Sequence, residues 1–95
     1  MIIEAPYKAN DTITIKTSAG EEIVARFIEE NDKEVTVQKP MAIMATQQGI
    51  GLGPLAFSLD PDAKIRLNKS TVLFVHKTEK QIASQYTQST TGLAI

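Results

Sequence analysis

Residues 13–43 constrain the fold most, because they hold three β-type runs joined by turns too short to contain a helix. Ile13 and Ile15 alternate with polar residues, which is the period-2 pattern of a half-buried strand. Gly20 ends the first turn and can take the positive φ that a short hairpin loop requires. Asn31-Asp32-Lys33 forms the second turn from residue types that tolerate turn dihedrals. The segment therefore predicts an antiparallel meander.

The middle run of this meander, residues 22–29, is apolar on both of its faces. One face carries Ile23, Ala25 and Phe27, and the other carries Val24, Arg26 and Ile28. A strand of this kind is usually central in its sheet, or bent so that it serves two packed layers. After the third run, Lys39-Pro40 predicts a bulge or an edge position, because proline cannot donate to a β-ladder.

The meander resembles the first signature motif of the Sm and Sm-like proteins, a family of RNA-binding ring formers. Gly20 matches the first glycine of that motif, and Ala25 stands where a second small residue permits a sharp bend. Asn31-Asp32-Lys33 corresponds to the third loop, shortened by one residue. Lys33 and Glu34 stand where the family has its RNA-contacting asparagine and its stacking aromatic residue.

The C-terminal β region resembles the second Sm motif. A short run at 64–67 leads through Asn68-Lys69-Ser70 into a final run at 71–77. This turn, the Asp60-Pro61-Asp62-Ala63 turn and the tail are also similar to small Sm-like proteins of marine cyanophage. The short, evenly spaced runs predict an all-β fold, a small bent five-stranded antiparallel barrel.

One domain is expected over residues 1–95, with a C-terminal helix and tail in 78–95. Thr78 and Gln81 have the spacing of a capping box, and Ile82 and Tyr86 share a helical face, so we expect a helix over residues 79–87.

The region between the two motifs is apolar and predicts an extended hairpin at 41–59. Residues 41–47 and 54–59 are its expected arms, and 47–54 its mobile turn. Gly49, Gly51 and Gly53 lack the spacing and the lysine of a phosphate-binding loop. The apolar side chains exceed what so small a domain can readily hide, and such a patch usually marks an interface; they are Met44, Ile50, Leu52, Leu55 and Phe57.

Composition argues against an enzyme. The chain has no cysteine and one histidine, His76, which alternation places on one face with Val72 and Phe74. We therefore expect no catalytic residues, no metal site and no cofactor. The sequence shows neither a signal peptide nor a stretch able to span a bilayer, so a cytoplasmic location is expected. A net charge of −1 means that any nucleic-acid binding must use a local patch.

The resemblance implies a homo-oligomeric ring in which the two turns converge at the pore. There they would bind nucleic acid, RNA more readily than DNA, through Asn31, Lys33, Asn68 and Lys69. Arg66 is the alternative cation if the second motif is shifted by one turn. The ring contact is expected between the edges at 55–59 and 71–77, with Leu55, Phe57, Val72 and Phe74 as its apolar contacts.

A second hypothesis stays open: a structural or assembly module that oligomerises and docks a protein partner through the apolar hairpin at 41–59.

Overall fold

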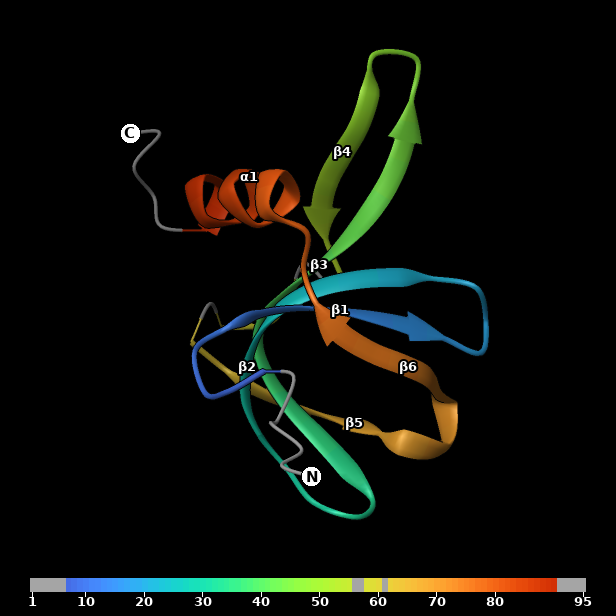
Figure 1. Cartoon of the computed structure of the whole chain (residues 1–95), viewed down its shortest axis with the longest axis vertical. Coiled ribbons are helices and arrows are strands. Elements are labelled where there is room, and N and C mark those ends of the chain that lie inside the picture. Colours follow the sequence, from blue (N-terminus) through green and yellow to red (C-terminus); the bar gives the residue numbers. More distant parts are fainter. Residues whose placement is uncertain (1–6, 56–57, 61, 91–95) are drawn as a thin grey trace, which may run out of the picture.

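The computed structural model describes residues 7–55, 58–60 and 62–90 (Figure 1). Its elements are β1 (Thr12–Thr17), β2 (Glu22–Glu30), β3 (Glu34–Thr46), β4 (Gly49–Pro54), β5 (Lys64–Asn68), the 3₁₀ turn η1 (Lys69–Thr71), β6 (Val72–Lys77) and α1 (Lys80–Thr90). The predicted all-β antiparallel fold with a short C-terminal helix is confirmed. Within the described residues the sheet has six strands rather than the expected five.

The sheet follows the order β4-β3-β2-β1-β6, and β5 also pairs with β3. β2 is therefore central, as its two apolar faces predict. The sheet curls into an open barrel (Figure 1). Side chains from five strands fill its interior and form the core. Its fully or nearly fully buried members are Ile13, Ile15, Ile23, Ala25, Phe27, Val35 and Val37. Tyr7 packs on this core, and its ring meets Phe27 edge-on at 4.7 Å between centroids.

β3 changes its surroundings at Lys39-Pro40. Residues 34–38 pair with β2 on one edge and with β5 on the other. The register with β2 then shifts between Val24 and Arg26, and Lys39 adopts a φ of 51°. This is the bulge that Pro40 predicts. Beyond it, residues 41–46 pair with β4.

The second arm of the hairpin is β4 and not the expected 54–59. The strands are joined by Gln47-Gln48 alone, and Gly49, Gly51 and Gly53 lie within β4. The prediction of a mobile turn at 47–54 is wrong, because regular pairing with β3 outweighs the low strand propensity of glycine. We call residues 41–54 the ribbon; it projects beyond the barrel (Figure 1).

β5 and β6 differ from the expected edge strands. Leu55, Ser58 and Leu59 are not in a strand, so the described part of 55–59 supplies no strand edge. Among the described strands, β5 pairs with β3 alone and β6 with β1 alone. The register between β6 and β1 shifts at Leu73, which is an extra residue without a partner in β1. As a result, Val72 and Val75 both pack on the core, while Phe74 is 54% exposed. The prediction that Val72 and Phe74 share a face is therefore wrong.

α1 spans Lys80–Thr90 rather than 79–87. Its first turn is capped by Glu79, whose carboxylate accepts the N–H groups of Gln81 and Ile82 at 3.0 Å each. These bonds lower the pKa of Glu79. Thr78 bonds the Thr14 hydroxyl instead, at 2.9 Å, so the expected capping box does not form. Tyr86 is fully buried and donates its hydroxyl to the Lys39 carbonyl at 2.7 Å, which attaches the helix to the bulge.

Candidate functional site

The two turns singled out by the sequence lie side by side. The Lys69 N–H donates to the Lys33 carbonyl at 2.8 Å, and Glu34 opposes Asn68 in the β3–β5 register. The β3–β5 pairing causes this contact, because it starts at the turn that precedes β3 and ends at the turn that follows β5. We call the two turns, Asn31-Asp32-Lys33 and Asn68-Lys69-Ser70, the ledge.

The two asparagines of the ledge hold its backbone in shape. Asn31 Oδ1 accepts the N–H groups of Lys33 and Glu34, both at 2.8 Å. Asn68 Oδ1 accepts the N–H of Ser70 at 2.9 Å and caps η1. Each side-chain oxygen is therefore engaged, and the amide Nδ2–H groups are what these residues offer to a ligand. Such donors match phosphate oxygens and the acceptor atoms of bases.

Lys69 is not a free cation. Its Nζ lies 3.1 Å from a carboxylate oxygen of Glu30, at the end of β2. The other Glu30 oxygen accepts the Tyr7 hydroxyl at 3.0 Å. Burial and this bond to Glu30 raise the pKa of Tyr7 to about 12. Because Lys69 and Glu30 lie far apart in the sequence, only the fold brings the two charges together.

Lys33 and Arg66 are the cations near the ledge without an ion pair inside the described ranges. Both are exposed. Arg66 lies on β5 between Ile65 and Leu67, which pack on the core, so the strand alternation puts Arg66 on the outer face. Acidic residues lie in and beside the ledge, so a single chain carries no strong positive field there; they are Asp32 within it and Glu29, Glu30 and Glu34 beside it.

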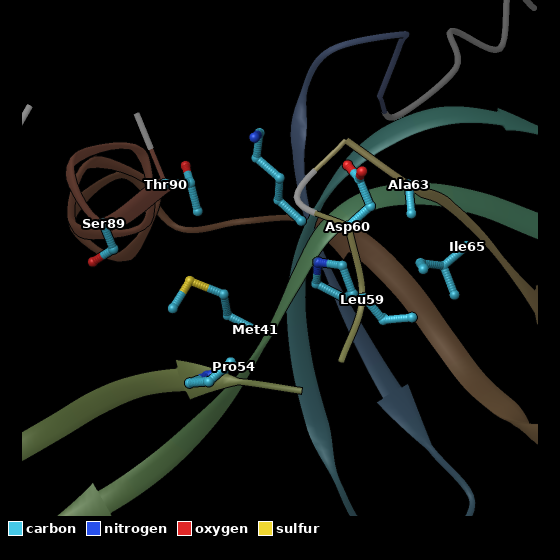
Figure 2. Close-up of a pocket in the computed structure, with 10 residues that line it drawn as sticks. Met41, Pro54, Leu59, Asp60, Ala63, Ile65, Ser89 and Thr90 are labelled. Atoms are coloured by element: carbon cyan, nitrogen blue, oxygen red, sulfur yellow. The ribbon is translucent and has the colours of Figure 1, made fainter. Parts of the chain in front are cut away.

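Two hollows adjoin these elements. One of about 300 Å³ lies beside the free edge of β6 and is lined by Tyr7, Val35, Lys69 and residues 72–75. The other, of about 250 Å³, lies between α1, the base of the ribbon and the start of β5 (Figure 2). Met41, Pro54, Leu59 and Ile65 give it a mainly apolar wall. The charged residues that line it are Lys39 and Asp60, and Lys39 pairs at 3.6 Å with Asp62, which is outside the lining.

In the described part of the chain, the potential metal ligands do not gather into a metal site. No group of three or more potential metal ligands occurs there. His76 Nδ1 lies 2.9 Å from the Lys77 carbonyl, next to it in the chain. Among the same residues, no helix has both the length and the apolar character needed to cross a bilayer.

The four residues predicted to form the ring contact differ in their exposure. Leu55 and Val72 are half-buried against the core, and Phe57 lies outside the described residues. Phe74 is exposed, as an interface residue must be before assembly. The sequence reasoning missed Leu73, which is 65% exposed. The uninterrupted apolar run Val72-Leu73-Phe74-Val75 is the signal that could have identified it, because strict alternation cannot bury both Val72 and Val75.

No protein-family model matches the chain, and no curated protein matches it. The case for a function therefore rests on the residues and contacts described above.

Proposed function

We propose that the protein is a cyclic homo-oligomer that binds single-stranded RNA along the ledge. The observation that carries the proposal is the direct contact between the two turns, through the 2.8 Å bond from the Lys69 N–H to the Lys33 carbonyl. Two segments that the Sm resemblance assigns to RNA binding thus form one continuous surface. Such a protein would act in the cytoplasm. If a phage encodes it, this would be the cytoplasm of the infected host cell.

Free strand edges support the cyclic assembly. The described outer edges of β5 and β6 have no strand partner, and unpaired edges tend to pair with another chain. Pairing β6 of one subunit with β5 of the next is head-to-tail, which closes into a ring when the rotation allows it. The exposed Leu73 and Phe74 would become buried at this contact. In this proposal, β5 replaces residues 55–59 as the strand edge that pairs with β6 of the next subunit.

The chemistry of the ledge favours phosphate contacts over base reading. Lysine is a point charge that suits phosphates, whereas arginine can form a two-pronged contact or stack on a base. Lys33 and Arg66 are available for these roles, and a ring repeats them around its axis. The ledge carries no aromatic residue, so it lacks the stacking that contributes about 1–3 kcal/mol per base in single-strand binders. We expect modest affinity and strong salt dependence.

RNA binding by the ledge is tested by fluorescence anisotropy with a labelled single-stranded RNA at low salt. Lys33→Ala and Arg66→Ala should each weaken binding several-fold. Lys69→Ala should have a smaller effect, because Glu30 already neutralises that side chain. Lys80→Ala removes the same charge from the start of α1 and is the matched control. The proposal fails if the wild type binds no RNA, or if Lys80→Ala weakens binding as much as Lys33→Ala.

The ring is tested separately by native mass spectrometry of the wild type. A Phe74→Glu variant places a charge on the β6 edge and should shift the population toward smaller species while circular dichroism stays unchanged. A wild type that remains a monomer at micromolar concentration would exclude the ring.

A second function, an assembly module that docks a protein partner through the hairpin, is favoured by one observation. Met44 and Ile50 of the ribbon are each 51% exposed. Failure of RNA binding in an otherwise intact oligomer would leave this as the better supported function.

A further inference from the structure

The ribbon is unusual in having no charge. Residues 40–59 contain no Asp, Glu, Lys or Arg, although charged residues make up 22% of the chain. Natural edge strands are normally protected from pairing by lysines, inward-pointing charges, proline or bulges. Between Met41 and Gly53 the ribbon has no lysine, no other charge and no proline. Within its described residues, the one register shift that affects β3 lies at the base of the ribbon.

Hairpin geometry shows which backbone groups the free edge of β3 presents. Gln47-Gln48 is a two-residue turn, so the flanking pair Thr46–Gly49 is hydrogen-bonded and the bonded pairs then alternate. The N–H and C=O groups of Ile43 and Ala45 therefore point away from β4. β2 pairs with β3 as far as Ala42, and the flanking bond of that pair takes up the Ile43 N–H. Among the described strands, the Ile43 carbonyl and the N–H and C=O groups of Ala45 therefore meet no partner.

The opposite edge of the ribbon is in a different situation. Gln85 on α1 donates its side-chain Nε2–H to the Ile50 carbonyl of β4 at 3.4 Å. Figure 1 shows α1 on the β4 side of the ribbon, with the upper arm of β3 on the side away from the helix. The edge of β3 is therefore the one left open for a partner.

The ribbon also lacks the strands that would make it stable by itself. An isolated two-stranded hairpin is marginally stable in water, and three or more strands with an apolar face are needed for independent stability. Here one face carries Ile43, Ala45, Ile50 and Leu52, while the other carries Met44 with the three glycines of β4. A further strand paired with the free edge of β3 would extend both faces of the ribbon. It would also form hydrogen bonds with the unpaired backbone groups of that edge.

We infer that the free edge of β3, at residues 43–46, pairs antiparallel with the same edge of a second copy of this chain. The product is a four-stranded sheet in the order β4-β3-β3-β4, with a two-fold axis between the two β3 strands. Such a contact is self-complementary, because each copy gives and receives the same hydrogen bonds.

Charge matching favours a second copy as the occupant. A strand that covers this edge must place its own side chains beside an uncharged surface, where a charge would lose water and find no partner. The described strands β1, β2, β5 and β6 all contain charged residues, whereas the ribbon has none. The surface that best matches the ribbon is therefore the ribbon itself.

This two-fold contact is independent of the proposed ring. The ring would use β5 and β6 head-to-tail, whereas the ribbon contact uses β3 with itself. If both form, two rings meet face to face and the subunit number is even. If the ring does not form, the ribbon contact alone gives a dimer. Failure of RNA binding leaves the inference untouched, because none of the ledge residues takes part.

The test is native mass spectrometry of the full chain with substitutions at Ala45, which is exposed. Ala45→Lys places a charge on the edge. Ala45→Pro removes an N–H that points away from β4, so the pairing within one copy keeps all its bonds. Gln88→Lys adds the same charge at an exposed position of α1 and is the matched control.

We expect the wild type to contain an even number of chains and both Ala45 variants to have half its mass, with unchanged far-UV circular dichroism. Gln88→Lys should keep the wild-type mass. A wild type with an odd number of chains, or a mass that neither Ala45 variant changes, would overturn the inference. A wild type without the contact that instead binds another polypeptide along β3 would also overturn it.

Discussion

The two halves of β3 belong to the same strand but to different environments. Residues 34–38, the barrel half, are paired on both edges, and Val35, Thr36 and Val37 are buried. Residues 41–46, the ribbon half, are paired with β4 throughout but with β2 only at Met41 and Ala42, and Met44, Ala45 and Thr46 are exposed. One strand therefore contributes to the core at one end and to a projecting surface at the other.

The difference shows what each half can do. The barrel half brings the two turns of the ledge together, because its pairing with β5 fixes the contact between Lys33 and Lys69. The ribbon half contributes little to the core, so its apolar side chains are available for a partner. Lys39-Pro40 separates the two roles, and Tyr86 holds that junction with bonds to the Gln38 and Lys39 carbonyls at 3.3 and 2.7 Å.

The largest expected difference in stability is between two single variants, one with a new charge in the barrel half of β3 and one with a new charge in the ribbon half. Val37→Asp buries a carboxylate in the core and should cost more than about 4 kcal/mol, a large share of the stability of a small domain. At a chain concentration low enough to dissociate the proposed ribbon contact, Ala45→Asp, in the ribbon half, should change the free energy of unfolding by less than about 0.5 kcal/mol. Urea denaturation followed by circular dichroism measures both. Equal costs would break the comparison.

A smaller contrast is expected at the two hairpin glycines. Gly20 joins β1 to β2 with a φ of 99°, and Gly49 starts β4 with a φ of 121°. Alanine is strained at either position, by about 1–2 kcal/mol. Gly20→Ala should lower global stability by about that amount. Gly49→Ala should speed hydrogen exchange mainly in ribbon amides, because the ribbon can open while the barrel stays folded. A global loss from Gly49→Ala would contradict this separation.

Tyr86→Phe tests the junction between the halves. It removes the hydroxyl that donates to the Lys39 carbonyl but keeps the buried ring. We expect a loss of about 1 kcal/mol, together with faster exchange in β3 near the bulge. Thr87→Ala, which removes an exposed hydroxyl bonded within α1, is the control and should have less effect. Indistinguishable results for the two variants would mean that Tyr86 holds the junction through packing alone.

The pH dependence of that junction follows from the same tyrosine. Burial raises the pKa of Tyr86 from its ordinary value of 10.0 to about 12. The stability that depends on the neutral phenol is therefore fully present below pH 10 and is lost as the pH rises through about 12. The stability advantage of the wild type over Tyr86→Phe should shrink across this window. Thermal melts at several pH values would show it, and a constant advantage would contradict it.

The barrel could be predicted from sequence because its signals are local. Alternation at Ile13 and Ile15, the glycine at position 20 and the turn at Asn31 specify the meander without knowledge of the tertiary structure. The ribbon could not be placed correctly, because three alternate glycines are typical of a loop. Only pairing with β3 makes the segment a strand.

The candidate site was predictable in part for the same reason. The turn residues were visible in the sequence, and the fold places their two turns in contact. The ion pair between Lys69 and Glu30 was not visible, since it joins residues from distant parts of the chain. The extra residue Leu73 is signalled only by the uninterrupted apolar run 72–75, and a strict period-2 assignment, such as the one made for Phe74, overlooks it.

The proposal that the ledge binds single-stranded RNA is tested most directly by comparing the salt dependence of RNA affinity in the wild type and in Glu30→Gln. Glutamine still accepts the Tyr7 hydroxyl but releases Lys69 from its ion pair. Glu21→Gln makes the same charge change at the β1–β2 turn and is the control. We predict that Glu30→Gln binds more tightly, with the slope of log affinity against log salt steeper by about 0.7 for each additional phosphate that the protein neutralises. An unchanged slope, or the same increase in affinity from Glu21→Gln, would contradict the assignment of the ledge as the RNA site.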